Sequence, residues 1–166
     1  MAYFGGVLYL LAGLLLGSLG VQGDESSYKE VCNKTGDYYY YCIDCFEKHQ
    51  NNDLDYGGIS INCTTDSALV VEKSVLEFSK NSTGKFQEAM NFCVEKVDAA
   101  AAHFAASLRC WREQRKEDTI EYIQYGRNNF TDCVYKLSPF NISVGFIRQL
   151  AAVTSYVQIS IIIVSL

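Results

Sequence analysis

Apolar side chains recur every three or four positions along most of the chain after about residue 57, which is the period of an amphipathic α-helix. The longest stripe comprises Phe86, Met90, Cys93, Val97, Ala100, Phe104, Leu108 and Trp111. A second stripe comprises Ile123, Gly126, Phe130, Cys133 and Leu137, and an earlier one comprises Ile61, Ala68, Val71, Val75 and Phe78. The last comprises Ile147, Leu150, Ala151, Thr154, Val157 and Ile161. The pattern predicts four long helices.

Short polar segments separate these helices. Asn81 and Gly84 in KNSTGK indicate a helix end and a turn, REQRKED indicates a second reversal, and Ser138-Pro139 precedes the last stripe. The chain has a single proline and no run of alternating valine or threonine. We therefore expect an all-α fold, an up-down-up-down four-helix bundle over residues 57–166 that follows a helical hairpin over about residues 24–56.

The N-terminus has the pattern of a secretory signal peptide. Residues 1–23 contain no charged side chain, and a leucine-rich run from Val7 to Leu16 leads into small residues ending at Gly23. Because Lys and Arg are missing before the apolar run, an uncleaved anchor is the alternative. We expect cleavage near Gly23, which leaves a single domain over residues 24–166.

Export favours disulfides for the cysteines, of which there are seven, so that one is left over. Cys93 lies about 18 residues before the reversal at REQRKED and Cys133 about 17 after it, so both return to the same level of two antiparallel helices. The alternative is two unpaired buried thiols. A bond between Cys32 and Cys42 would close a small ring, and it would hold a short hairpin that could not fold alone.

Charge and candidate chemistry exclude several functions. The net charge of −5 argues against nucleic acid and anionic lipid as partners and weakly favours a basic protein partner. His49 and His103 have no catalytic neighbours in the sequence, and the CxxC from Cys42 to Cys45 has no good second ligand pair for zinc. DLDYGG fails the spacing of a calcium loop, since Thr64 stands where a glutamate is required. We expect no enzyme activity, no cofactor and no metal.

Several Asn-X-Ser/Thr triplets accompany the export signal, and together they support a glycoprotein. The candidate acceptors are Asn33, Asn62, Asn81, Asn129 and Asn141.

The combination of these features resembles the plant invertase and pectin methylesterase inhibitors. The features are the early pair Cys32 and Cys42, DLDYGG entering the first long helix, Cys93 and Cys133 on a helical hairpin, and LSPF before the final helix. The resemblance covers about residues 28–164. In that family the first cysteine pair staples the N-terminal hairpin and the second joins two bundle helices. Cys45 and Cys63 are extra to this framework and could form a third bond, which would leave Cys110 free.

The resemblance implies a secreted inhibitor that occludes an enzyme cleft in a one-to-one complex. Pectin methylesterase is favoured over acid invertase as the target, although the sequence departs from the motifs of both groups of inhibitors. Lys116-Glu117-Asp118 stands where invertase inhibitors often have Pro-Lys-Phe, and Asp132 stands where pectin methylesterase inhibitors often have a threonine before the cysteine that corresponds to Cys133. The implied docking face draws on the second and third bundle helices, with Glu95 and Asp132 as candidates. The expected location is the apoplast, or the vacuole if the target is a vacuolar invertase.

Two other classes of function stay open at this stage. One is a secreted helical protein that binds a small apolar ligand or a receptor without inhibiting an enzyme. The other is a surface protein whose apolar tail, VQISIIIVSL, is a lipid-attachment signal. The tail continues the last helical stripe and has no polar spacer before it, so we expect it to belong to the fold and the mature protein to have no membrane attachment.

Overall fold

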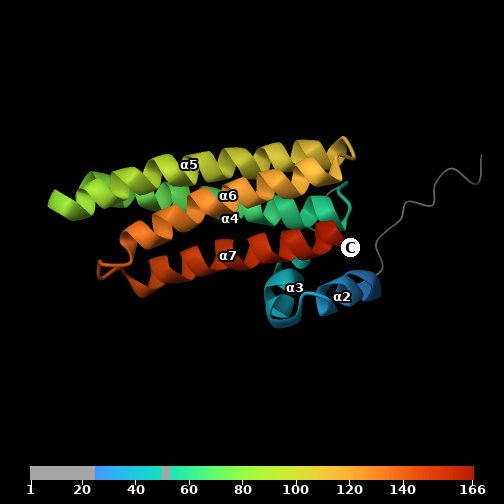
Figure 1. The fold of residues 1–166 in the computed structure, drawn as a ribbon. Helices are drawn as coiled ribbons and strands as arrows, with labels where there is room; N and C mark the ends of the chain where they lie inside the picture. The colour runs from blue at the N-terminus through green and yellow to red at the C-terminus, as the bar shows by residue number, and fades with distance from the viewer. Residues whose placement is uncertain (1–24, 50–52) are drawn as a thin grey trace, which may run out of the picture.

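The computed structural model describes residues 25–49 and 53–166, and every regular element in these ranges is a helix (Figure 1). The prediction of an all-α fold is therefore confirmed. The signal peptide predicted for residues 1–23 lies outside the described residues.

Four long helices form the bundle that the periodicity predicts. They are α4 (Tyr56–Asn81), α5 (Gly84–Arg112), α6 (Lys116–Leu137) and α7 (Val144–Ser165). Short turns make consecutive helices antiparallel, so the bundle runs up-down-up-down (Figure 1). Gly84 adopts a φ of +61° at the turn between α4 and α5, a backbone conformation that glycine tolerates better than other residues.

A hairpin of short helices precedes the bundle and lies beside α7 (Figure 1). It consists of α2 (Glu25–Asn33), the 3₁₀ turn η1 (Gly36–Tyr38) and α3 (Tyr39–Lys48). The Cys32–Cys42 disulfide closes the hairpin, with the two Cα atoms 5.5 Å apart. Tyr28 and Phe46 stack across it, with ring centroids 5.8 Å apart. The predicted disulfide-stapled hairpin is thus present.

The segment DLDYGG starts the first bundle helix. Asp55 is the N-cap of α4, because its carboxylate accepts a hydrogen bond from the backbone N–H of Gly58 at 2.8 Å. The same carboxylate oxygen accepts a hydrogen bond from the indole N–H of Trp111 at 2.6 Å. A Cβ atom at Gly57 would lie 2.3 Å from the Trp111 ring, so glycine allows the end of α5 to pack over the start of α4.

The bundle core is closely packed around Phe104, which is fully buried. Gly126 on α6 lies against this ring, and an ideal Cβ atom at Gly126 would approach the Cε1 atom of Phe104 to 2.4 Å. Gly126 therefore sets how closely α5 and α6 approach each other.

We expect Gly126→Ala to lower the free energy of unfolding by about 1–3 kcal/mol, because a methyl group would displace Phe104 in a filled core. Gly145→Ala is the matched control, since Gly145 also lies in a helix but has no atom within 4 Å of its ideal Cβ position. The control is expected to gain up to about 1 kcal/mol from helix propensity. Urea denaturation of both variants measures the difference, and equal effects would contradict the close contact.

The last helix, α7, contributes to two separate cores. Its residues in the bundle core are Phe146, Leu150, Val153, Val157 and Val164. Tyr156, Ile159 and Ile163 instead pack with Cys32, Cys42 and Phe46 of the hairpin. α7 is the one helix in the described part of the chain that is long and apolar enough to span a membrane by length and composition. These two cores account for its apolar character.

The predicted inward stripe of this helix is partly wrong. Leu150 and Val157 are buried as expected, but Ile147, Ala151 and Thr154 are exposed. The predicted stripe was misplaced because α7 is apolar on almost every side, so the periodicity cannot show which side faces the core.

Candidate functional site

The second and third bundle helices, α5 and α6, carry a set of partly or fully exposed side chains that we call the α5–α6 face. Its members are Phe92, Lys96, His103, Tyr122, Tyr125, Asp132 and Lys136. The Cys93–Cys133 disulfide joins the two helices beneath one end of this face, with the Cα atoms 4.7 Å apart. The surface is therefore held by a covalent bond as well as by the helix packing.

One half of the α5–α6 face is aromatic. The rings of His103, Tyr122 and Tyr125 form a triangle, with His103 5.9 Å from Tyr122 and 5.6 Å from Tyr125, and the two tyrosines 6.4 Å apart between centroids. Tyr125 is 45% exposed, and its hydroxyl donates a hydrogen bond to Glu121. This hydrogen bond to a carboxylate raises the pKa of Tyr125, so its hydroxyl stays protonated. Partly exposed aromatic rings of this kind are enriched in protein interfaces.

The other half carries charged residues, two of which, Lys96 and Asp132, pair across the helices. The Lys96 ammonium lies 3.2 Å from a carboxylate oxygen of Asp132 and donates a longer hydrogen bond of 3.4 Å to Asn129. Lys96 and Lys136 both lie 5.6 Å from the centroid of the Phe92 ring, which is the geometry of cation–π contacts. This half can present both signs of charge to a partner.

The two acidic residues proposed from the sequence, Glu95 and Asp132, have different surroundings in the structure. Asp132 belongs to the Lys96 ion pair, whereas Glu95 is exposed on α5 one helical turn from Phe92. The Glu95 side chain makes no ion pair or hydrogen bond with the described residues. The sequence reasoning missed the His103 and tyrosine cluster. Tyr122 and Tyr125 are spaced as neighbours on a helix, but their meeting with His103 depends on the alignment of two helices.

The turn that begins α6 carries an exposed ion-pair cluster. Arg115 contacts Glu113 at 2.7 Å and Asp118 at 2.6 Å. Hydrogen bonding to Glu113 and then to Asp118 outweighs desolvation and raises the pKa of the Arg115 guanidinium. Lys116, Glu117 and Asp118 thus form the first turn of α6 at one end of the α5–α6 face.

The glycosylation candidates differ in how they lie. Asn33, Asn81 and Asn141 are exposed, and each lies at or beyond a helix end. Asn129 is half-buried within the α5–α6 face, and Asn62 is half-buried on α4 beside His49. The first three therefore stay the better candidates, because a glycan there would extend into solvent.

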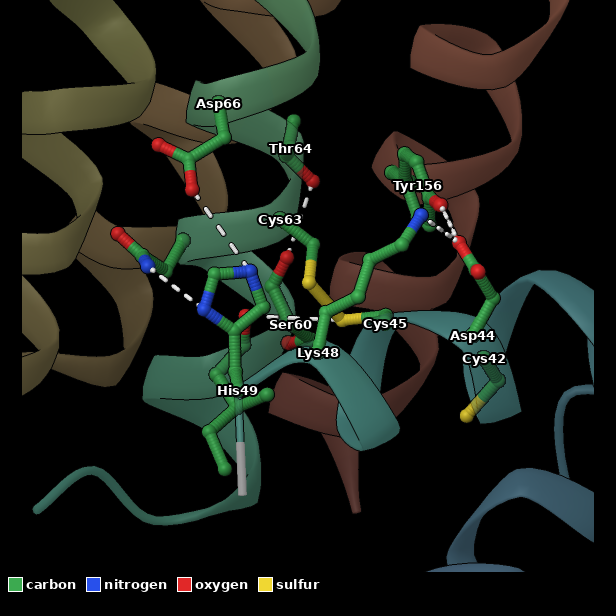
Figure 2. Close-up of a disulfide and its surroundings, with 12 residues drawn as sticks. Cys42, Asp44, Cys45, Lys48, His49, Ser60, Cys63, Thr64, Asp66 and Tyr156 are labelled. Atoms are coloured by element: carbon green, nitrogen blue, oxygen red, sulfur yellow. Dashed lines mark hydrogen bonds and ion pairs between the residues drawn. A yellow bond between two sulfur atoms is a disulfide. The ribbon is translucent and has the colours of Figure 1, made fainter. Parts of the chain in front are cut away.

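The hairpin is anchored to the bundle by a second group of contacts (Figure 2). The Cys45–Cys63 disulfide joins α3 to α4, with the Cα atoms 5.9 Å apart. Beside it, Asp44 accepts hydrogen bonds from Lys48 at 2.6 Å and from the Tyr156 hydroxyl at 2.9 Å. On the other side of the disulfide, His49 lies 3.7 Å from Asp66. The remaining cysteine, Cys110, is buried and free.

The contact between Asp44 and Tyr156 shifts the pKa values of both groups. Burial tends to raise the pKa of Asp44, but the hydrogen bonds from Lys48 and Tyr156 outweigh it, and the net pKa is lowered from 3.8. Burial and the same hydrogen bond raise the pKa of Tyr156 well above its usual range. Tyr156 is therefore a neutral donor to a charged carboxylate throughout the physiological range.

We expect Tyr156→Phe to lower the free energy of unfolding by about 1 kcal/mol at pH 7, since Asp44 is half exposed and loses one hydrogen bond. A carboxylate with a lowered pKa contributes its full stability above pH 3.8 and loses it as the pH falls through the lower value of the folded state. The gap between variant and parent should therefore close towards pH 2.

Urea denaturation at pH 7, 4 and 2.5 measures this gap. Tyr135→Phe serves as the control, because the Tyr135 ring is 72% exposed on α6. A gap for Tyr156→Phe that stayed constant from pH 7 to pH 2.5 would contradict the link to Asp44.

Comparison with known proteins supports the architecture at the level of structure alone. No protein-family model matches the sequence, and no curated protein is similar to it in sequence. The structure is similar to the crystal structure of a pectin methylesterase inhibitor from Arabidopsis thaliana, with a TM-score of 0.64 and 11% sequence identity. The match covers 86% of this chain and 97% of that chain. The chain therefore has the fold of that inhibitor.

Proposed function

We propose that this chain is a secreted protein inhibitor that binds a plant pectin methylesterase one to one and covers its active-site cleft. The observation that carries the proposal is the shared fold, which extends over 97% of the Arabidopsis inhibitor and 86% of this chain. The proposed inhibitor performs no chemistry of its own, because it acts by blocking access to the enzyme.

The α5–α6 face is the surface proposed to dock. It combines partly exposed aromatic rings at His103, Tyr122 and Tyr125 with paired charges at Lys96 and Asp132. A protein–protein interface of standard size buries about 800 Å² on each partner. Because α5 and α6 are joined by Cys93–Cys133, little backbone order has to be gained on docking, which favours tight binding.

Charge pairing changes the role expected of the acidic residues. The negative charge of Asp132 is neutralised by Lys96, so Asp132 would not attract a basic partner as a free charge. The ion pair would instead contribute to specificity, by facing groups of the opposite charges on the partner. Glu95 can extend the docking surface at its outer edge. The α5–α6 face is mixed in sign, and apolar contact through its tyrosines is expected to dominate the affinity.

The site of action is proposed to be the apoplast. The signal peptide predicted for residues 1–23, the glycosylation triplets and three disulfides all suit an oxidising, extracellular compartment. The mature domain would then span residues 24–166, without cofactor or membrane anchor.

The test is a side-by-side titration of the mature protein against a plant pectin methylesterase and an acid invertase. We expect stoichiometric inhibition of the esterase and a one-to-one complex on size-exclusion chromatography. Inhibition of the invertase alone would show that the target is an acid invertase and not a pectin methylesterase. If neither enzyme is bound or inhibited at micromolar concentrations of the folded protein, the proposed function is wrong.

A further inference from the structure

A groove of about 300 Å³ lies where the hairpin meets the bundle. It is formed by Lys48 at the end of α3 and His49 directly after it, by Asp66 and Val70 from α4, and by residues of α7. In Figure 1, α3 and α7 lie on the side of the bundle away from α5. The groove is therefore separate from the α5–α6 face.

The walls of the groove combine an apolar surface with polar groups. The Cys45–Cys63 disulfide, Val70 and Ala152 supply the apolar part. Ser67 and the side-chain amide of Gln149 supply neutral polar groups. This mixture is typical of sites for small molecules, in which a few polar groups orient a ligand against an apolar wall.

The charged groups around the groove are already paired. Lys48 is bound to Asp44, which also accepts the Tyr156 hydrogen bond, and His49 lies against Asp66 and Asn62 (Figure 2). The Lys48 ammonium and the His49 ring thus each have a carboxylate close by. A ligand with a net charge would gain little here, because either sign would meet a like charge within the same small groove.

One polar atom of the lining is not paired. The side-chain oxygen of Gln149 is buried and has no hydrogen-bond partner among the described residues. A buried acceptor of this kind destabilises the protein unless a donor reaches it. The groove is therefore best suited to a neutral molecule that carries an O–H or N–H donor.

We propose that this groove binds a single uncharged sugar residue. A pyranose ring supplies several hydroxyl donors and acceptors, which suit the Gln149 oxygen, together with an apolar C–H face, which suits the disulfide and Ala152. Its one-ring size suits a groove at the lower end of the roughly 300–1,000 Å³ range of ligand sites. The groove is open on one side, so the residue can be a free sugar or one unit of an oligosaccharide.

The experiment is a titration of isotope-labelled mature protein followed by NMR. The probes are methyl β-D-galactopyranoside, methyl β-D-glucopyranoside, D-galacturonate and phenol, and cellobiose and lactose test a residue within a longer chain. We expect saturable shifts of the Gln149 side-chain amide and the Ala152 methyl group with a neutral glycoside, and weaker binding of D-galacturonate. Tighter binding of a disaccharide would assign the residue to an oligosaccharide.

Two variants with matched controls locate the binding. Gln149→Leu should weaken it about five- to tenfold, the effect of one lost hydrogen bond, while Gln124→Leu, at an exposed glutamine of α6, should leave it unchanged. Ala152→Leu should fill the groove and abolish binding, whereas Ala151→Leu, at an exposed neighbour, should not.

Several results would overturn the proposal: no saturable shift at the groove with any saccharide, binding of phenol alone, or undiminished binding by Gln149→Leu. In the first case a bound water would be sufficient to pair the Gln149 oxygen. Because the groove lies away from the α5–α6 face, these results are independent of whether the protein inhibits an esterase.

Discussion

Deletion of residues 151–166 is expected to leave no folded protein. The deleted segment includes about the last two thirds of α7, and the deletion removes Val153, Val157 and Val164 from the bundle core. It also removes Tyr156, Ile159 and Ile163 from the hairpin core. Burial of each such side chain stabilises a protein by about 1.5–3 kcal/mol.

The combined loss is on the order of 10 kcal/mol, which is comparable to the whole free energy of unfolding of a typical domain, roughly 5–15 kcal/mol. The truncated chain should therefore show no cooperative melting transition, and a cell should retain or degrade it instead of secreting it. Circular dichroism of the purified chain and the yield in culture medium measure the two effects.

The matched control removes only Ser165 and Leu166, which are exposed at the end of α7. It should fold and melt within a few degrees of the parent. A long truncation that is secreted with unchanged stability would show that the tail is a processing signal and that α7 is not needed for the fold.

Replacement of Tyr125 by alanine is expected to weaken inhibition of the target enzyme by at least about 30-fold. The ring is 45% exposed beside His103 on the proposed docking face, so a partner can bury it fully. Loss of a buried interfacial tyrosine commonly costs about 2 kcal/mol or more of binding free energy. The fold should be preserved, because Tyr125 lies outside the bundle core.

Tyr40→Ala is the control for this substitution. Tyr40 is 83% exposed, but it lies on the hairpin, away from α5 and α6. Inhibition constants for the parent and both variants, measured with melting temperatures, separate loss of binding from loss of stability. If Tyr125→Ala inhibits as well as the parent while a complex still forms, the enzyme binds another face and the docking assignment is wrong.

The helical periodicity was most informative where polar and apolar residues alternate clearly. All five residues of the stripe from Ile123 to Leu137 are buried, as are Met90, Cys93 and Phe104 on α5. The same reasoning misplaced the inward side of α7, where Ile147 and Ala151 are exposed. A helix that packs against two cores has few polar positions to mark its outer side, so its orientation depends on its neighbours.

Features that depend on residues close in the sequence could be predicted from the sequence, whereas sites formed by several helices could not. The helical class, the short hairpin and the spacing of Cys93 and Cys133 follow from interactions between residues close in the chain or from the length of two helices. The groove near Gln149 and the cluster of His103 with Tyr122 and Tyr125 need elements that are far apart in the sequence. Their geometry depends on the register of packed helices, which is set by the fit of side chains such as Phe104 against Gly126 and not by any periodic pattern.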